Sequence, residues 1–275
     1  MTDKSLNQKI NDIVNFISNK LTEKPQIGMI LGSGLGNIVD SIKDKIILPY
    51  SDIPHLPQIN APGHAGNLIL GQISKKPFII MQGRFHLYEG HSPQAATLLV
   101  RAMKKLGVDK LIITCAAGGM NIRFQAGEIM VITDHINFTG TNPLIGLNLD
   151  EFGPRFPNMF DIYTKKLQKI VQKVAVDHQI RLCKGVYAGY LGPTYSTRAE
   201  LAFYLGSKCD AVGMSVVQEA IVAAHCNMQI LGLAAITDIA LPNVIKHATE
   251  AEVIATGKKT AATFKKLIKE IAKQL

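Results

Sequence analysis

The stretch QGRFHLYEGH, residues 82–91, follows a short apolar run at 78–81 that predicts a buried strand, and it leads into a helix start. It places an arginine, a histidine and a glutamate on one strand-to-helix turn. Arg84 offers a planar fork of donors that suits an oxyanion. His86 can donate or accept a hydrogen bond, and Glu89 is close enough in sequence to fix its tautomer. The alternative interpretation is a solvated loop whose charges pair with one another.

The composition is that of a folded globular protein, with 275 residues of which 47% are hydrophobic and 19% charged. Its 30 Lys and Arg outnumber 21 Asp and Glu, which gives a net charge of +9. The lysines are scattered or C-terminal and lack interleaved aromatics, so we expect a solvated surface that steers anions and no nucleic-acid partner. The four cysteines have neither CxxC pairing nor metal-ligand spacing. They predict reduced thiols in a cytoplasmic protein without a metal site.

Apolar runs and amphipathic segments alternate along the chain. Strands are expected at 27–31, 67–73, 78–81, 110–114, 128–133, 185–191, 211–215 and 229–237. Helices are expected at 37–42, 93–106, 163–178 and 217–226, with one more that begins within 192–200 and a last one from 249 onward. An N-terminal amphipathic helix, and not a secretory signal, is predicted by Leu6, Ile10, Ile13, Ile17 and Leu21. Polar residues interrupt the apolar region 220–237, so no membrane span is expected. No repeat or linker divides the chain, and 1–275 is expected to form one α/β domain with a central mixed sheet and helices on both faces.

A glycine-rich turn, GSGLG at 32–36, comes directly after the strand expected at 27–31. Glycines let the backbone approach a ligand, and free N–H groups at a helix start favour an anion. The dinucleotide fingerprint fails because Asn37 replaces its last glycine, and the mononucleotide P-loop lacks its Gly-Lys-Ser/Thr ending. A phosphate held by Ser33 and the backbone is one interpretation, and an ordinary tight turn is the other.

Several motifs in one order resemble the trimeric purine nucleoside phosphorylases. They are GSGLG at 32–36, GRFHLYEGHS at 83–92, AAGG at 116–119, DHINFTGTNPL at 134–144 and DAVGMS at 210–215. The resemblance implies a phosphorylase/hydrolase-like α/β fold that assembles as a homotrimer. It also implies cleavage of a purine (deoxy)ribonucleoside by inorganic phosphate, which yields free base and (deoxy)ribose 1-phosphate for purine salvage. No metal or organic cofactor is implied.

The same resemblance implies a role for each matching residue. Phosphate would contact Ser33, Arg84, His86, the backbone of Ala116, and Ser215. Ribose would contact Tyr88, Met214, and Phe156 lent by the neighbouring subunit, with Glu250 near the 5′-hydroxyl. The base would contact Tyr195, Ser196 and Asp238, and the catalytic residues would be His86, Glu89 and Asp238.

Ser196 and Asp238 depart from the guanosine and inosine enzymes that the chain resembles, which carry Glu and Asn at these places. Adenine presents N1 as an acceptor and a 6-amino donor. Ser196 can donate to that N1, and Asp238 can accept from the amino group or, when protonated, donate to N7. A 6-aminopurine preference is therefore one interpretation. In the other, Ser196 or Thr197 caps the next helix together with Glu200.

Two further functions remain open on the sequence. Ser196 and Asp238 resemble the methylthioadenosine phosphorylases, a sister group with the same fold, although Glu250 suits a 5′-hydroxyl better than a methylthio group. His247 lies close to Glu250, and the alignment is loose there. A non-catalytic nucleoside-binding protein on this fold is the other alternative, because fold does not imply activity. The complete phosphate set argues against it.

Overall fold

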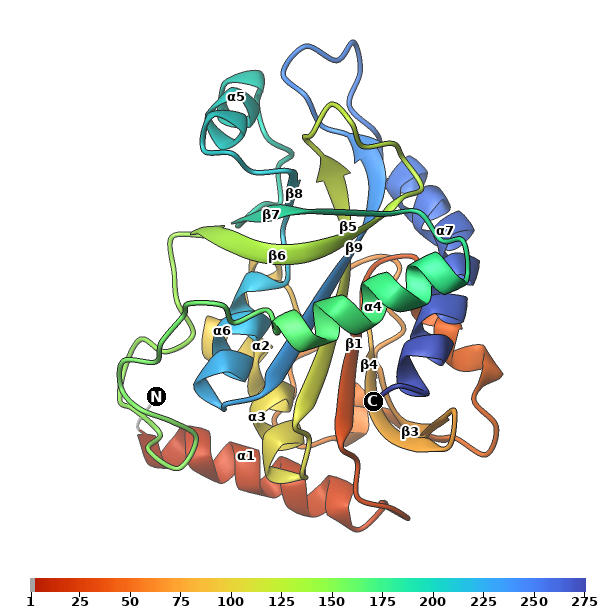
Figure 1. Cartoon of the computed structure of the whole chain (residues 1–275). Helices are drawn as coiled ribbons and strands as arrows, with labels where there is room; N and C mark the ends of the chain where they lie inside the picture. The colour runs from red at the N-terminus through yellow and green to blue at the C-terminus, as the bar shows by residue number, and fades with distance from the viewer. Residues whose placement is uncertain (1–2) are drawn as a thin grey trace.

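The framework of the computed structural model, which describes residues 3–275, is a nine-stranded mixed sheet (Figure 1). The strands are β1 (Ile27–Leu31), β2 (Ile46–Pro49), β3 (Asn67–Ile73), β4 (Lys76–Gln82), β5 (Lys110–Gly119), β6 (Ile129–Phe138), β7 (Leu182–Tyr190), β8 (Ala211–Gly213) and β9 (Gln229–Ile239). Their order is β2-β3-β4-β1-β5-β8-β7-β6-β9, and β9 also pairs with β5. Strands β5 to β9 therefore close into a ring, and β1 to β4 extend from β5 as an open flank.

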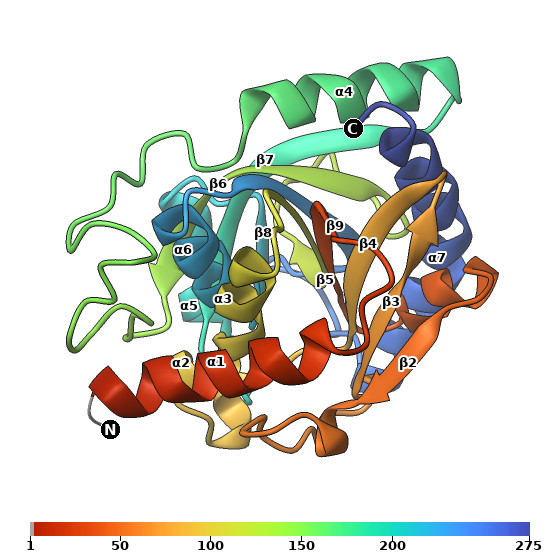
Figure 2. The ribbon, with the colours of Figure 1, turned by 90° about the horizontal axis from the view of Figure 1, so that it is seen from below.

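Helices cover both faces of this sheet, as predicted (Figure 2). The α-helices are α1 (Asp3–Ser18), α2 (Pro93–Ala96), α3 (Leu98–Lys105), α4 (Lys165–Asp177), α5 (Arg198–Gly206), α6 (Val217–His225) and α7 (Glu250–Ala272). Short 3-10 helices are η1 (Gly36–Ser41), η2 (Tyr50–Asp52) and η3 (Leu87–Glu89). One apolar core packs α1, α3 and α6 on the sheet, and a second packs α4, α7 and η1 on the other face. A small third core joins α5 to the tips of the ring.

Apolar spacing fixes which side of each helix is buried. In α1, Ile10, Ile13 and Ile17 recur at helical intervals and are fully buried. Leu21 is expected on the same face, but α1 ends at Ser18 and Leu21 packs on the core from the following turn. Within residues 3–275, no helix combines the length and the hydropathy that a membrane crossing requires.

The parallel part of the sheet determines where a ligand can bind. β1 pairs in parallel with β4 and β5, and β5 pairs in parallel with β9. All five residues of β1 are buried, as expected for a strand covered on both faces. The carboxyl ends of β4, β1, β5 and β9 consequently meet at one edge, where open α/β sheets bind their ligands.

Several elements differ from the prediction: β2 is not among the expected strands, the strand expected at 128–133 continues to Phe138, and the segments 93–106 and 110–119 differ as follows. The helix expected at 93–106 is interrupted at Thr97, whose φ of −110° and ψ of 10° leave the helical region. The Thr97 hydroxyl donates to the Pro93 carbonyl at 2.8 Å, a local side-chain bond that competes with the helix ladder. β5 extends five residues beyond the expected 110–114, because small residues at 115–119 continue to pair with β9 and β8 across a register shift.

Candidate active site

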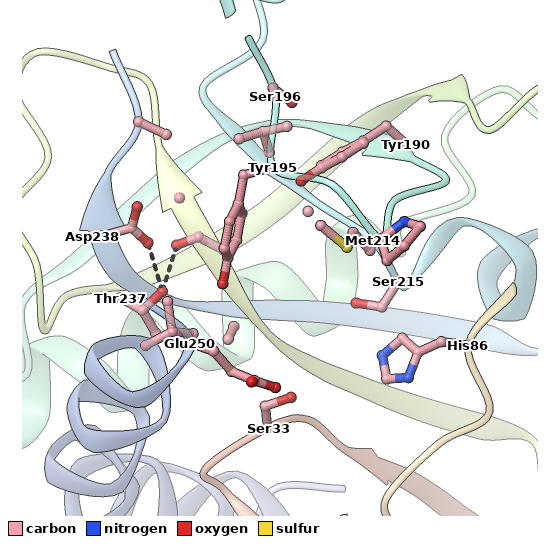
Figure 3. A pocket seen from close by; sticks show the side chains of 18 of the residues that line it. Ser33, His86, Tyr190, Tyr195, Ser196, Met214, Ser215, Thr237, Asp238 and Glu250 are labelled. Carbon is pink, nitrogen blue, oxygen red and sulfur yellow. Dashed lines mark hydrogen bonds between the residues drawn. The ribbon is translucent and has the colours of Figure 1, made fainter. Parts of the chain in front are cut away.

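A cavity of ≈ 380 Å³ lies at the shared edge of β1, β4, β5 and β9 (Figure 3). The predicted site residues that line it are Ser33, Arg84, His86, Tyr88, Ala116, Tyr195, Ser196, Met214, Ser215, Asp238 and Glu250. Ser33, His86 and Ser215 lie toward one end, and Tyr195 and Asp238 toward the other. The structure thus brings together residues separated by more than two hundred positions.

The glycine-rich turn after β1 owes its position to a close backbone approach. A Cβ on Gly32 would lie 2.6 Å from the Cα of Cys115 on β5, so only glycine fits. The Gly32 N–H donates to the Thr114 hydroxyl at 3.1 Å, and that hydroxyl donates to the Ile30 carbonyl at 2.9 Å. These contacts place Ser33 at the cavity wall.

Arg84 is almost completely buried, with an exposed fraction of 1%. Its Nη2 donates to the Thr114 carbonyl at 2.8 Å. Its Nε lies 3.0 Å from Oε1 of Glu219, on α6. One hydrogen bond at Nη2 and one ion pair at Nε, which lacks hydrogen-bond geometry, thus engage the guanidinium. The side chain still borders the cavity, where its positive charge would meet an anion.

Glu89 does not line the cavity but contacts His86. Oε1 of Glu89 accepts the His86 backbone N–H at 2.9 Å and lies 3.4 Å from the imidazole Nδ1. Burial alone would raise the pKa of Glu89, but hydrogen bonds from His86 and from the Asn60 amide outweigh it and lower the pKa to about 2. Burial lowers the pKa of His86. The His86 ring stacks on Tyr88 with centroids 4.6 Å apart.

His64 joins this group, and the sequence motifs do not identify it. Its Nε2 lies 3.2 Å from the Ser33 hydroxyl, and its ring centroid is 5.1 Å from that of His86. Burial, followed by the nearby charges of His86 and Arg84, lowers the pKa of His64 to about 3. The one signal in the sequence is the composition of residues 49–66, a stretch rich in Pro, Gly and His that is typical of a loop over a site.

A strained turn delivers Ser215. The Val217 N–H donates to the Ser215 carbonyl at 2.8 Å across Val216, whose φ of 71° and ψ of −53° define a γ-turn of the rare strained type. A β-branched residue in this region costs on the order of 1–3 kcal/mol. The Ser215 N–H also donates to the Tyr187 hydroxyl at 3.3 Å, from a buried tyrosine that no sequence motif singles out. The packing therefore holds Ser215 against the backbone preference.

The opposite end of the cavity carries Ser196 and Asp238. Burial raises the pKa of Asp238, although the Thr237 hydroxyl donates to its Oδ1 at 3.0 Å. Ser196 is 9% exposed and lies near the Tyr190 phenol, but its hydroxyl has no partner at hydrogen-bond geometry. Thr197, and not Ser196, caps α5 by accepting the Glu200 N–H at 3.3 Å. The Ser196 side chain lines the cavity beside the Tyr190 and Tyr204 phenols.

Between the two ends, α7 contributes Glu250 as its first residue, directly after the capping Thr249. His247 lines the cavity as well and stacks on Tyr195 with ring centroids 6.3 Å apart. Both candidates for the 5′ end, between which the motif alignment does not choose, are therefore present. Among residues 3–275, no group of three or more His, Cys, Asp or Glu is placed to hold a metal ion.

Phe156 lies outside the cavity of its own chain, on the irregular segment between β6 and α4, and is 88% exposed. Arg155 fixes this segment by donating from Nη1 to the carbonyls of Leu144 and Gly146 at 2.9 and 2.7 Å. Phe156 is therefore presented outward. Its contact with a neighbouring subunit's ribose remains a prediction.

Comparison with known proteins agrees with this geometry. The phosphorylase superfamily pattern matches residues 26–273. Purine nucleoside phosphorylase 1 of Bacillus subtilis is 47% identical over 98% of this chain and 99% of its own, and the Bos taurus purine nucleoside phosphorylase is 38% identical over 94% and 91%. A Schistosoma mansoni purine nucleoside phosphorylase solved with adenosine superposes with a TM-score of 0.93 at 37% identity, covering 98% of this chain and 97% of that one.

The chain therefore belongs to the phosphorylase superfamily, and within it to the family of the purine nucleoside phosphorylases. The family resemblance and the α/β fold expected from the sequence motifs are both confirmed.

We expect stability to fall with acidity because His64 is held neutral. Its pKa is about 3 in the folded protein against 6.5 for an unperturbed histidine, so between these values only the unfolded chain takes up the proton. The contribution is complete above pH 6.5 and is lost toward pH 3. Lowering the pH from 7 to 5 should therefore reduce the free energy of unfolding by about 2 kcal/mol. Urea unfolding at both values measures this loss, and His64→Asn should reduce it; an unchanged loss in the variant would contradict the assignment.

Proposed function

We propose that this protein is a purine nucleoside phosphorylase, which uses inorganic phosphate to release the base of a purine nucleoside as (deoxy)ribose 1-phosphate forms. One observation carries the proposal. A single cavity contains the buried Arg84 beside serine and histidine side chains at one end. The other end of the same cavity contains Ser196 and Asp238 together with the Tyr195 ring. Such a site can hold a phosphate, a sugar and a purine in line.

The chemistry follows from the two ends. Phosphate bound by Arg84, Ser33 and Ser215 approaches the anomeric carbon from below, and the glycosidic bond breaks with positive charge developing on the ribose. The phosphate's negative charge stabilises that ribose in a site shielded from water. His86, held by Glu89, donates to or accepts from the phosphate or the sugar hydroxyl it faces.

The departing purine needs its growing negative charge stabilised. Asp238 can supply this by donating a proton to N7, because burial raises its pKa and favours the protonated acid. In the same position its other oxygen accepts from a 6-amino group, and the unpaired Ser196 hydroxyl donates to N1. We therefore propose that the pocket accepts 6-aminopurine nucleosides. One Schistosoma mansoni purine nucleoside phosphorylase structure holds adenosine and another holds inosine, so relatives of this fold hold both base types.

Methylthioadenosine is the second candidate substrate, favoured by the Ser196 and Asp238 pair. The 5′ region disfavours it, because Glu250 and His247 are polar where a methylthio group needs apolar contacts. A hydroxyl at the 5′ position suits these side chains.

We also propose a cytoplasmic homotrimer that needs only phosphate as co-substrate. The exposed Phe156 supports a shared site, since a large aromatic side chain held in water serves no purpose within its own chain. Ile145, Leu147 and Phe160 on the same segment are exposed as well, and together they offer an apolar surface to a second copy.

Replacement of Arg84 by Ala should reduce phosphate-dependent base release by roughly 10²–10³-fold, because a buried donor to the anion is lost. The assay follows free base from inosine and adenosine with and without phosphate. Arg123→Ala, which alters an exposed arginine away from the cavity, is the matched control. Unchanged phosphorolysis in Arg84→Ala would refute the phosphate assignment.

The base end can be tested by Asp238→Asn. An asparagine amide donates to O6 and N7 of a 6-oxopurine but cannot release a proton. We therefore expect kcat/KM for adenosine to fall at least about tenfold, and the ratio of kcat/KM for inosine to that for adenosine to rise. Adenosine, inosine, guanosine and 5′-methylthioadenosine are compared side by side, with exposed Asp52→Asn as control. A wild-type preference for inosine and guanosine would show that the pocket interpretation is wrong.

The assembly can be tested through Phe156. Light scattering should give a mass about three times the 29.9 kDa of the chain. Phe156→Ala should raise KM for the nucleoside roughly tenfold without changing that mass, because an aromatic contact to the sugar is lost. Val176→Ala, which removes an exposed apolar side chain from α4 outside this segment, is the control. A fully active monomer would exclude the shared site.

A further inference from the structure

A buried carboxylate beside an anion site needs a physical reason. Glu219, on α6, is only 5% exposed, and its Oε1 lies 3.0 Å from Nε of Arg84. Its negative charge opposes the binding of any phosphate at Arg84. A glutamate that served helix capping alone would be expected at the solvent, since buried carboxylates are tolerated only when paired.

The geometry around Arg84 supplies the reason. The guanidinium has a fixed acceptor at Nη2, the Thr114 carbonyl of β5, and a fixed counter-charge at Nε, the Glu219 carboxylate of α6. These partners engage two of the three guanidinium nitrogens, and the side chain still borders the cavity. Without Glu219, a single carbonyl contact would hold the fork, and the plane could rotate about the side-chain torsions.

Charge balance is the second consequence. Arg84, His86 and His64 gather at one end of the cavity, and burial lowers the pKa of both histidines, which keeps them uncharged near neutral pH. Arg84 is then the cation of this end, and Glu219 cancels part of its charge. An uncompensated arginine shielded from water would hold phosphate, and equally the phosphate group of the product, too tightly for rapid turnover, since uniform binding does not raise kcat.

A small cavity of ≈ 20 Å³, lined by His86, Ser215, Gln218 and Glu219 among others, adjoins the phosphate end. That volume accommodates about one water molecule. Gln218 Oε1, buried and without a protein partner, faces this region. A shorter acid at position 219 would withdraw from Arg84 and leave room for a water between them.

We propose that Glu219 is a positioning residue that orients Arg84 and, by opposing its charge, sets the affinity of the site for inorganic phosphate. This inference rests on the proposed function, because it takes the anion at Arg84 to be phosphate. Glu219 touches neither phosphate nor nucleoside; it acts through Arg84.

Two substitutions separate charge from position. Glu219→Gln keeps the length and an amide oxygen near Nε but removes the charge, so KM for phosphate should fall roughly tenfold while KM for the nucleoside stays unchanged. Glu219→Asp keeps the charge but shortens the reach, so KM for phosphate should rise roughly tenfold and kcat should fall. Glu270→Gln, which removes the same charge from α7 away from the cavity, should leave both constants at the wild-type values.

The opposite changes in KM for phosphate distinguish a positioning role from a purely structural one. A structural role would lower the melting temperature of both variants without moving their KM values for phosphate in opposite directions. An unchanged or raised KM for phosphate in Glu219→Gln overturns the proposal. If that variant does not fold, Glu219→Asp decides alone: a wild-type KM for phosphate then overturns the proposal.

Titration calorimetry with inorganic phosphate alone provides the same comparison without turnover. Wild-type protein that binds phosphate but releases no base would defeat the proposed function, and the phosphate affinities of the variants would then decide the role of Glu219.

Discussion

The burial of one guanidinium constrains much of this structure. A charged group 1% exposed is stable only where dipoles and counter-charges surround it. For Arg84 these come from the β5 backbone and from α6, while the glycine-rich turn after β1 packs on the same stretch of β5. The burial of Arg84 therefore depends on both the parallel strands and the helix that follows at their end. Gly32 and the turn at Val216, which precedes α6, both lie within the segments that surround Arg84.

Local signals make much of the fold predictable. Apolar runs of a few residues mark the strands, and polar or glycine-rich motifs follow them directly, so that the sequence alone places Ser33, Arg84 and Asp238 at strand ends. The parallel order then gathers those ends at one edge. Element lengths are harder to predict: β5 continues through alanines and glycines whose extended state depends on pairing with β9 and β8.

Residues whose importance arises only from tertiary contacts cannot be found this way. His64 is one histidine in a loop, and it matters because the loop folds back onto Ser33. Glu219 stands in the first turn of an apolar helix, where an acidic residue normally interacts with the helix dipole. Tyr187 resembles any other strand residue. The sequence likewise does not decide whether Ser196 or Thr197 caps α5. The path of the backbone decides it, and Thr197 is the cap.

Two of the three apolar cores border the cavity. The phosphate end rests on the large core beneath α3 and α6, whereas Leu201, Val212 and Ala240, which border the base end, belong to the small core under α5. Packing changes in the small core need not be transmitted to Arg84, because few side chains are shared. Descendants of such a protein can drift in the purine they accept while the bond-breaking apparatus stays intact. The base end of the cavity can therefore change in evolution more freely than the phosphate end.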